Sequence, residues 1–350
     1  MDAGRDEKWG NVGASIPLSR PDLSGNELKY VTDCIKSGWI THKGKYVTQF
    51  EDAFSKFVDK ESISCSSGTA ALHLALLACG IGPGDEVIVP DLTFANTASV
   101  VKHVGATPVL VDIGDDFCID VNLAEAWITE RTKAIIPVHL YGMEANISAL
   151  MRLAYQHNLW IIEDCCEALW IKPTAHYSAY SFYGNKTMTT GEGGMLSLSL
   201  SHFAKQFRDG GFDDEYNHSV AGLNYRMTNL QAALGCAQLE RVDEFISKTL
   251  QNAAIYNDRL NGKGEWLFVT EGNPKSLRQG LKDYGIETRP VFWPLHLMKP
   301  YENKREFYNA VREWKTGICL PTGPHLTMKD IDFICEKVEQ FNETRWLECR

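Results

Sequence analysis

The chain has 350 residues, of which 44% are hydrophobic and 23% are charged, the proportions of an ordinary globular protein. This length is enough for one large and one small domain, or for two domains of similar size. The formal net charge of −10 argues against a nucleic-acid binder, but anionic small molecules remain compatible because a local site can be basic.

The cysteines and the lack of long apolar runs indicate in which cellular compartment the protein is expected. The ten cysteines form no CxxC pair and have no regular spacing, so we expect reduced thiols and neither a disulfide framework nor a metal site. The first ten residues are polar with mixed charge, unlike a signal peptide, and no apolar run is long enough to span a bilayer. We therefore expect a cytoplasmic protein with no membrane partner.

The N-terminal part predicts an arm followed by two helices. Residues 1–20 form the arm. Ser24, with Glu27 three residues later, is a candidate capping box for a helix that ends near Gly38. After a loop, a second amphipathic helix is expected over residues 48–58.

A strand, a glycine turn and a helix follow between residues 62 and 80. The turn SSGT separates a short strand from the helix AALHLALLA. A helix that starts in this way presents unpaired backbone N–H groups at its positive end, where phosphate binds. Gly68 and Thr69 occupy that place, although an ordinary strand-to-helix turn has the same pattern.

Strands and helices then alternate up to residue 200, which predicts an α/β fold with a mostly parallel, doubly wound sheet. In such sheets ligands bind at the carboxyl ends of the strands. Asp164 ends the apolar strand that begins at Trp160, and Phe94 stands just past the strand VIVP.

The remaining chain predicts a long helix and a second, smaller domain. The helix is expected from Thr228 into the 250s and would join the two domains. Beyond Glu265, a strand, a helix, an extended segment and a terminal helix predict an α+β unit. We place a large domain at residues 1–245 and a small domain at residues 246–350.

Lys186 stands alone in the stretch YSFYGNKTMTTGEGGM, among small, polar and glycine residues that let the backbone pass close to a bound group. A lysine can be neutralised by a Schiff base with an aldehyde, but a lysine in a glycine-rich turn is commonly a solvated loop residue.

The rest of the chain favours the Schiff-base interpretation of Lys186. Asp164 can keep a pyridine nitrogen protonated and Phe94 can stack on a ring. Phosphate contacts can come from Gly68, Thr69 and Ser181.

These motifs, in this order, resemble those of the DegT/DnrJ/EryC1/StrS family of sugar-nucleotide aminotransferases over about residues 15–340. The matching segments include SGWIT, SSGTAALHLAL, GPGDEVIVPDLTF, IIEDCCEA, SFYGNKTMTTGEGG, LNYRMTNLQAALGCAQLER and GIETRPVFWPLH. The resemblance implies the pyridoxal phosphate-dependent aspartate-aminotransferase fold (fold type I). That fold has a mostly parallel seven-stranded sheet in the large domain and a smaller α+β C-terminal domain. It also implies a homodimer with shared active sites.

The resemblance also implies roles for individual residues. Lys186 corresponds to the Schiff-base lysine, Asp164 to the partner of the pyridine nitrogen, and Glu167 to a position, often glutamine, near the ring hydroxyl. Phe94 corresponds to the stacking aromatic residue. The implied phosphate contacts are Gly68, Thr69, Ser181 and, from the second subunit, Asn224. Further residues expected near the substrate are Trp39, Thr41, Tyr141, Arg226, Arg289 and His296. Each of these residues also has an alternative interpretation without a role in substrate binding, as a core aromatic residue, a surface charge or a loop histidine whose hydrogen bonds are satisfied.

The implied reaction moves an amino group from L-glutamate, through pyridoxamine phosphate, to the 4-keto carbon of a nucleotide-linked 4-keto-6-deoxyhexose. The product would be a 4-amino-4,6-dideoxy sugar of the perosamine or viosamine type. Alternatives are amination at C3 or of a cyclitol, a pyridoxal phosphate-dependent dehydratase, and a non-catalytic regulatory homologue. The related sugar 3-dehydratases carry a histidine at the lysine position, so Lys186 favours transamination.

Three features depart from the family pattern. The connection from Asp164 to Ser181 is shorter than usual, Trp170 stands where a glycine is common, and the segment after Asn261 is abbreviated. Such changes reshape the cleft or the dimer contact and leave the cofactor residues in place. The choice among GDP, UDP and dTDP, and the stereochemistry at C4, stay open.

Overall fold

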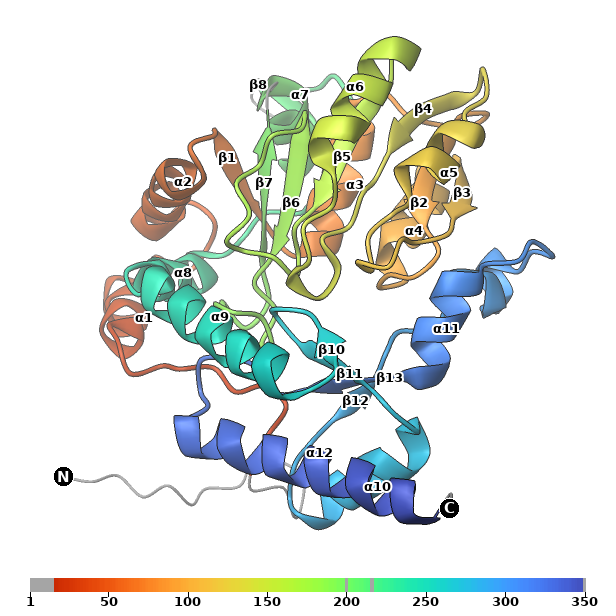
Figure 1. Cartoon of the computed structure of the whole chain (residues 1–350). Helices are drawn as coiled ribbons and strands as arrows, with labels where there is room; N and C mark the ends of the chain where they lie inside the picture. Colours follow the sequence, from red (N-terminus) through yellow and green to blue (C-terminus); the bar gives the residue numbers. More distant parts are fainter. Residues whose placement is uncertain (1–15, 199–200, 215–216, 349–350) are drawn as a thin grey trace.

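The computed structural model describes residues 16–198, 201–214 and 217–348, which Figure 1 draws as two layered units, one above the other. The upper unit contains a seven-stranded sheet in the order β1-β7-β6-β5-β4-β2-β3, and the lower unit contains a four-stranded sheet in the order β10-β11-β13-β12. In the large sheet only β7 runs against its neighbours, β1 and β6. The expected α/β class, with a mostly parallel seven-stranded sheet and a smaller C-terminal unit, is therefore confirmed.

The strands of the large sheet are short. Their bounds are β1 Ser62–Cys65, β2 Glu86–Pro90, β3 Thr107–Val111, β4 Thr132–Ile135, β5 Trp160–Asp164, β6 Tyr177–Ser181 and β7 Gly194–Leu198. The helices of this unit are α1 Glu27–Ser37, α2 Lys45–Val58, α3 Gly68–Ala78, α4 Asn96–His103, α5 Val121–Ala126, α6 Ile147–His157, α7 Ser201–Arg208 and α8 Asn229–Leu239. A two-stranded ribbon, β8 Phe212–Asp214 with β9 Asn217–His218, follows α7.

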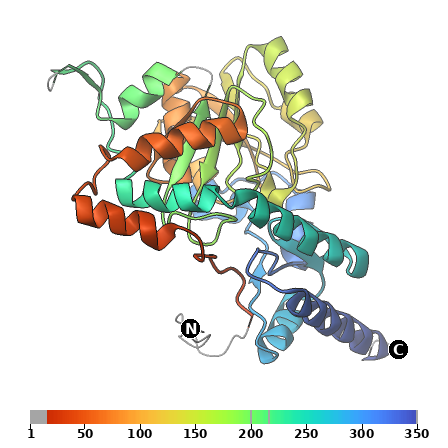
Figure 2. The ribbon, with the colours of Figure 1, turned by 90° about the vertical axis from the view of Figure 1, so that its left-hand side faces the viewer.

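Helices cover both faces of the large sheet because successive side chains of a buried strand point to opposite sides. In β2, Val87 and Val89 enter the core cluster that contains α3 and α4, whereas Ile88 enters the cluster that contains α5 and α6. Near β6 and β7, Tyr180 packs on this second face against α2 and α8. The sheet is thus the middle layer of three (Figure 2).

The small unit is built from β10 Gly262–Lys263, β11 Phe268–Glu271, β12 Arg289–Pro290, β13 Gly317–Leu320 and the helices α9 Val242–Arg259, α10 Pro274–Asp283, α11 Tyr308–Thr316 and α12 Met328–Glu348. Its core joins Tyr256, Phe268 and Ile334. Ile16 is part of this core and exchanges backbone hydrogen bonds with Gly285 and Glu287. The boundary at residue 245 falls within α9 and stays a prediction.

The long helix expected from Thr228 is in fact two helices, so this prediction is wrong. Thr228 does cap α8 and forms a capping box with Gln231. However, Arg241 leaves the helical conformation, with φ −120°, between α8 and α9. Its guanidinium binds Asp22 at 2.9 Å and Glu244 at 2.9 Å. A tertiary ion pair accompanies a break that the amphipathic pattern does not show.

The capping box expected at Ser24 is also absent. Ser24 Oγ donates to Asp22 Oδ1 at 2.6 Å, and Glu27 accepts a hydrogen bond from Gln238 at 2.7 Å. Asn26 is the N-cap of α1 and makes no side-chain capping bond. The end of this helix at Gly38, in the left-handed conformation, agrees with the sequence.

None of the helices in the described part of the chain combines the length and the hydropathy that crossing a bilayer requires.

The short connection between β5 and β6 is held by two charges of opposite sign, one buried and one half-buried. The Glu163 carboxylate, which is fully buried, accepts the N–H groups of Thr174 and Ala175 at 3.0 and 2.7 Å and the hydroxyl of Ser178 at 3.2 Å. From the other side, Lys60 Nζ donates to the carbonyl oxygens of Ala175 and His176. Together these bonds fix the segment that carries the residues following Asp164.

Hydrogen bonding sets the charge state of Glu163. Burial alone raises its pKa, but His139 and the N–H groups of Thr174 and Ala175 outweigh burial and hold the pKa below its usual value. A carboxyl group with a lower pKa in the folded protein contributes stability above its unfolded pKa and loses it as the pH falls through the folded pKa.

We expect Glu163→Gln to lower the free energy of unfolding at pH 7 by about 1–3 kcal/mol, because two backbone N–H groups lose a charged acceptor. The deficit should shrink on acidification below pH 4, where the wild-type carboxylate is itself protonated. Denaturant unfolding at both pH values measures this. Glu125→Gln, on an exposed face of α5, is the matched control, and equal losses in the two variants would contradict the assignment.

Candidate active site

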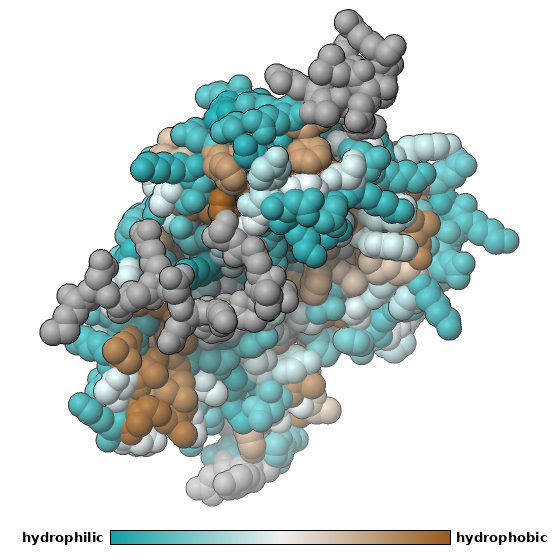
Figure 3. Space-filling model, turned by 90° about the horizontal axis from the view of Figure 1, so that it is seen from below, coloured by the Kyte–Doolittle hydropathy of each residue, from teal (hydrophilic) through white to brown (hydrophobic). Residues whose placement is uncertain are grey.

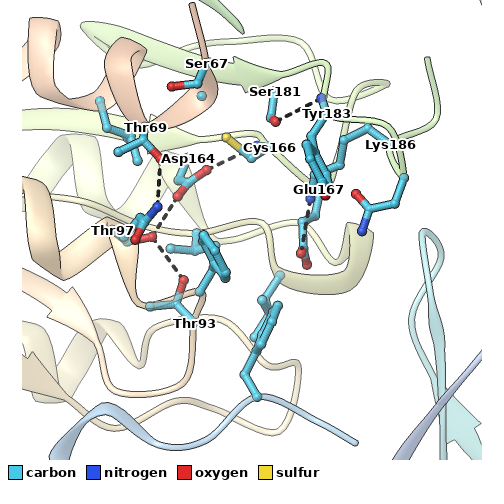
Figure 4. A pocket seen from close by; sticks show the side chains of 18 of the residues that line it. Ser67, Thr69, Thr93, Thr97, Asp164, Cys166, Glu167, Ser181, Tyr183 and Lys186 are labelled. Atoms are coloured by element: carbon cyan, nitrogen blue, oxygen red, sulfur yellow. Dashed lines mark hydrogen bonds and ion pairs between the residues drawn. The ribbon is translucent and has the colours of Figure 1, made fainter. Parts of the chain in front are cut away.

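A cavity of about 320 Å³ lies at the carboxyl ends of the parallel strands. Its lining comes from the loops after β1, β2, β4, β5 and β6, and from β12 of the small unit with the segment that follows it. Figure 4 draws 18 of these side chains, which converge from separate elements, and labels ten of them. The predicted residues that line it are Gly68, Thr69, Phe94, Asp164, Glu167, Ser181, Lys186 and Arg289.

Lys186 enters the cavity from the loop after β6. Its side chain is 14% exposed, and Nζ lies 3.4 Å from Glu167 Oε1 and 4.0 Å from the centre of the Trp266 ring. The other oxygen of Glu167 accepts the backbone N–H of Tyr141 at 3.0 Å. The amine is therefore held between one carboxylate and one aromatic face, within reach of a ligand in the cavity.

Asp164 is held rigidly at the end of β5. Oδ2 accepts the hydroxyl of Thr97 at 2.9 Å and Oδ1 accepts the backbone N–H of Cys166 at 3.1 Å. The hydroxyl of Thr97 is also hydrogen-bonded to that of Thr93 at 3.2 Å. In Figure 4, Thr97 therefore lies between Asp164 and Thr93. A buried carboxylate fixed in this way can accept one further hydrogen bond from a ring N–H in the cavity.

The N-terminus of α3 forms the end of the cavity that lies opposite Lys186. Ser67 caps this helix by accepting the N–H of Ala70, and the helix itself offers no carbonyl to the N–H groups of Gly68 and Thr69. A Cβ on Gly68 would lie 2.7 Å from Cys166 Sγ and 2.9 Å from the Ser181 Cβ. The backbone thus comes close to both neighbours, and the helix end is suited to an anion.

Phe94 and Phe292 form an aromatic edge of the cavity. Their ring centres are 5.9 Å apart, and Phe94 is 55% exposed. Tyr141, expected near the substrate, does not line the cavity. It is fully buried, stacks on Phe292 and accepts the N–H of Phe292 with its hydroxyl at 3.1 Å. Tyr141 therefore acts on the site through its neighbours.

The structure does not bring His296 to the cavity. Its Nδ1 lies 2.6 Å from Asp91 Oδ2, its ring stacks on Phe307, and it is 7% exposed. This is the satisfied loop histidine that was the alternative interpretation. The remaining predicted residues lie outside the lining of this cavity. Trp39, Thr41 and Asn224 are exposed, and Arg226 donates to the carbonyl oxygen of Asp209.

Several residues of the cavity are absent from the sequence-based set. Thr93 lies in the loop before α4 and Thr97 in the first turn of this helix. Two threonine hydroxyls close to a helix start and just after a buried strand could have indicated a shared role. Phe292, which lines the cavity, and Trp266, which packs on Lys186 beside it, carry no such signal, because aromatic residues in a small domain usually belong to its core.

The residues present fit pyridoxal phosphate. The cavity offers a lysine amine for the aldehyde, a fixed carboxylate for the pyridine nitrogen, an exposed aromatic face and a helix N-terminus with a close glycine for the phosphate.

Comparison with known proteins bears on this fit. The model of the DegT/DnrJ/EryC1/StrS aminotransferase family matches residues 21–273 and 266–339. The chain belongs to this family. It is 40% identical to the GDP-perosamine synthase of Escherichia coli O157:H7, over 93% of this chain and 98% of that protein. It is also 40% identical to the GDP-perosamine synthase of Caulobacter vibrioides, with the same coverage.

A solved structure extends the comparison to the cofactor. NtdA from Bacillus subtilis, with the bound cofactor PMP, superposes with a TM-score of 0.84 at 28% identity, over 90% of this chain and 81% of that one. These findings confirm the family resemblance, and this aminotransferase uses pyridoxal phosphate as its cofactor.

We expect Gly68→Ala to raise the dissociation constant of pyridoxal phosphate by about tenfold or more, because the new Cβ forces Cys166 and Ser181 away from the helix end. Titration of the apoenzyme, followed by cofactor absorption, measures this. Gly82→Ala is the control, since its Cβ would meet only the Val104 carbonyl oxygen at 3.9 Å. Unchanged affinity in the Gly68 variant would place the phosphate elsewhere.

Proposed function

We propose that this aminotransferase moves the amino group of L-glutamate to C4 of a GDP-linked 4-keto-6-deoxyhexose. One observation carries the reaction type: Lys186, Asp164 and Phe94, which are far apart in the sequence, line a single cavity. Near full-length similarity to two GDP-perosamine synthases supports this choice of acceptor. The intact lysine disfavours a dehydratase or a non-catalytic role.

The geometry gives each residue a task. Bound pyridoxal phosphate supplies an electron sink for the carbon that loses or gains a proton. Asp164, oriented by Thr97 and the Cys166 N–H, keeps a proton at the pyridine nitrogen. Lys186 Nζ takes the proton from Cα of the donor and later delivers one to C4 of the sugar. Glu167 compensates the charge of the ammonium group between these transfers.

We expect Lys186→Ala to lower turnover by roughly a factor of 10⁴ or more, because no other residue would supply the amine. Lys172→Ala, exposed on the β5–β6 connection, is the matched control. The assay supplies L-glutamate and GDP-, UDP- and dTDP-linked 4-keto sugars and identifies the product by NMR. Full activity in the Lys186 variant would overturn the mechanism, and an amino group at C3 would overturn the acceptor position.

We also propose a homodimer in which each subunit completes the other's site. Large hydrophobic side chains are exposed on and around α1, namely Leu23, Leu28, Ile35, Trp39 and Ile40. Figure 3 shows hydrophobic side chains gathered at the lower left, on the side of the molecule where Figure 1 draws α1. Asn224 is exposed and lies outside its own cavity lining. A second copy of the chain would cover the apolar face and receive Asn224.

Subunit mixing tests the shared site. Lys186→Ala and Asn224→Ala should each be poorly active alone, but a re-equilibrated equal mixture should recover about a quarter of wild-type activity. Half of the dimers are then mixed, and each mixed dimer holds one site with both residues intact. Sedimentation analysis establishes the dimer in each sample. A mixture no more active than its components would show that both residues serve the same subunit.

The cytoplasm is the compartment that we propose. All nine cysteines in the described part of the chain are free. Free thiols that lie close to buried functional groups, as Cys165 and Cys166 do, favour a reducing environment.

A further inference from the structure

Arg289 carries two buried N–H groups that have no partner. Nε and Nη2 of its guanidinium are among the seven buried side-chain atoms without a hydrogen bond in the described residues. The Glu167 carboxylate lies 3.8 Å from Nη2, which is beyond hydrogen-bonding distance. Arg289 nevertheless lines the cavity.

The two unpaired atoms form one edge of the guanidinium. Nε–H and one N–H of Nη2 are parallel, and this edge matches the two oxygens of a carboxylate in a bidentate pair. Leaving such groups buried and unpaired is unfavourable. A ligand carboxylate would satisfy both at once.

Aromatic rings hold the Nε–Nη2 edge of Arg289, called the fork below, in place. The guanidinium carbon lies 4.7 Å from the centre of the Phe292 ring, 5.2 Å from that of Trp266 and 5.9 Å from that of Tyr141. Cation–π contacts of this kind favour the charged group and restrict its rotation. Burial is the largest single effect and lowers the pKa of Arg289, but Glu167, Cys319 and Tyr141 together hold this pKa above its usual value. The fork is therefore charged and fixed before any ligand arrives.

The position of the fork selects the ligand group. Nη2 of Arg289 and Nζ of Lys186 approach the same Glu167 oxygen, at 3.8 and 3.4 Å, and both cations lie over Trp266. An anion bound here is thus close to the reacting carbon. The α-carboxylate of an amino acid is one bond from that carbon, whereas the diphosphate of a sugar nucleotide is attached at C1, across the ring from C4.

The phosphate end of the cavity is separate from this corner. In Figure 4, Ser67 and Thr69 lie at one side of the pocket, and Glu167 and Lys186 lie at the other. Arg289, as a neighbour of Glu167, belongs to the second side. The cofactor phosphate has its own helix N-terminus and does not need this arginine.

We propose that the Nε–Nη2 edge of Arg289 binds the α-carboxylate of the amino donor. This assignment rests on the proposed transamination and names the donor subsite within the same cavity. It makes Arg289 a substrate-binding residue for the first half-reaction and gives it no direct contact in the second, when the keto sugar occupies the site.

The experiment compares three donors with the wild type and Arg289→Met. L-Glutamate carries both carboxylates, L-2-aminobutyrate keeps only the α-carboxylate, and 4-aminobutyrate keeps only the other. The first half-reaction is followed by the loss of cofactor absorption as pyridoxamine phosphate forms. Because the variant removes two charge-assisted hydrogen bonds, we expect roughly 100-fold slower reaction with the first two donors and little change with 4-aminobutyrate.

Matched measurements exclude a structural cause. The resting spectrum of the variant should equal that of the wild type, and its pyridoxamine phosphate form should react with the keto sugar nucleotide at an unchanged rate. Arg289→Lys, which keeps the charge without the fork, should recover only part of the loss. Arg305→Met, an arginine stacked on Trp127 at 4.0 Å and outside the cavity lining, should behave as the wild type.

Other outcomes overturn the proposal. Equal losses with all three donors would show general disruption, and a loss confined to 4-aminobutyrate among the two monocarboxylates would place the other carboxylate on the fork. A slower second half-reaction with an unchanged first one would assign the fork to the diphosphate. If the wild type itself rejects every keto sugar, the proposed acceptor fails, whereas the donor comparison still decides the role of Arg289.

Discussion

Two consecutive carboxylates at the end of β5 determine how the site is built. Because side chains alternate along a strand, Glu163 and Asp164 point to opposite faces. Glu163 fixes the β5–β6 connection through Thr174, Ala175 and Ser178, and Asp164 faces the cavity. The strand is buried from Ile161 to Asp164, so neither group can relax toward water. The precise placement of the cavity acid therefore depends on the packing beneath it.

Tyr141 makes one of the contacts between the two units, beside Glu167. Tyr141 has φ 55° although it is not glycine, an unfavourable conformation that persists only where the surroundings enforce it. Its N–H donates to Glu167, and its carbonyl oxygen accepts the N–H groups of Glu265 and Trp266. The large unit thus carries the carboxylate next to Lys186, and the same backbone residue positions the tryptophan that covers this lysine.

The sequence could predict the elements whose signals are local. The strand ending at Asp164, the glycine turn at Gly68 and the lysine loop follow from periodicity and turn chemistry, and the parallel sheet brings them to one edge. The pairing of His296 with Asp91 and the break at Arg241 could not be predicted, because both depend on partners about 200 residues away. Trp266 and Phe292 could not be predicted for the same reason, because they approach the cavity only when the small unit packs against the large one.

The departures from the family pattern that we expect from the sequence meet at one corner of the site. Trp170, on the shortened connection, packs so closely that a Cβ on Gly142 would lie 2.6 Å from its ring and 2.7 Å from the backbone nitrogen of Trp266. Trp266 itself comes from the abbreviated segment after Asn261, and its ring lies over both Lys186 and Arg289. The phosphate end keeps its glycine and its helix N-terminus. The departures expected from the sequence therefore lie at the Lys186 corner of the cavity, and we expect substrate selection to depend on the packing of the small unit against Tyr141 and Gly142.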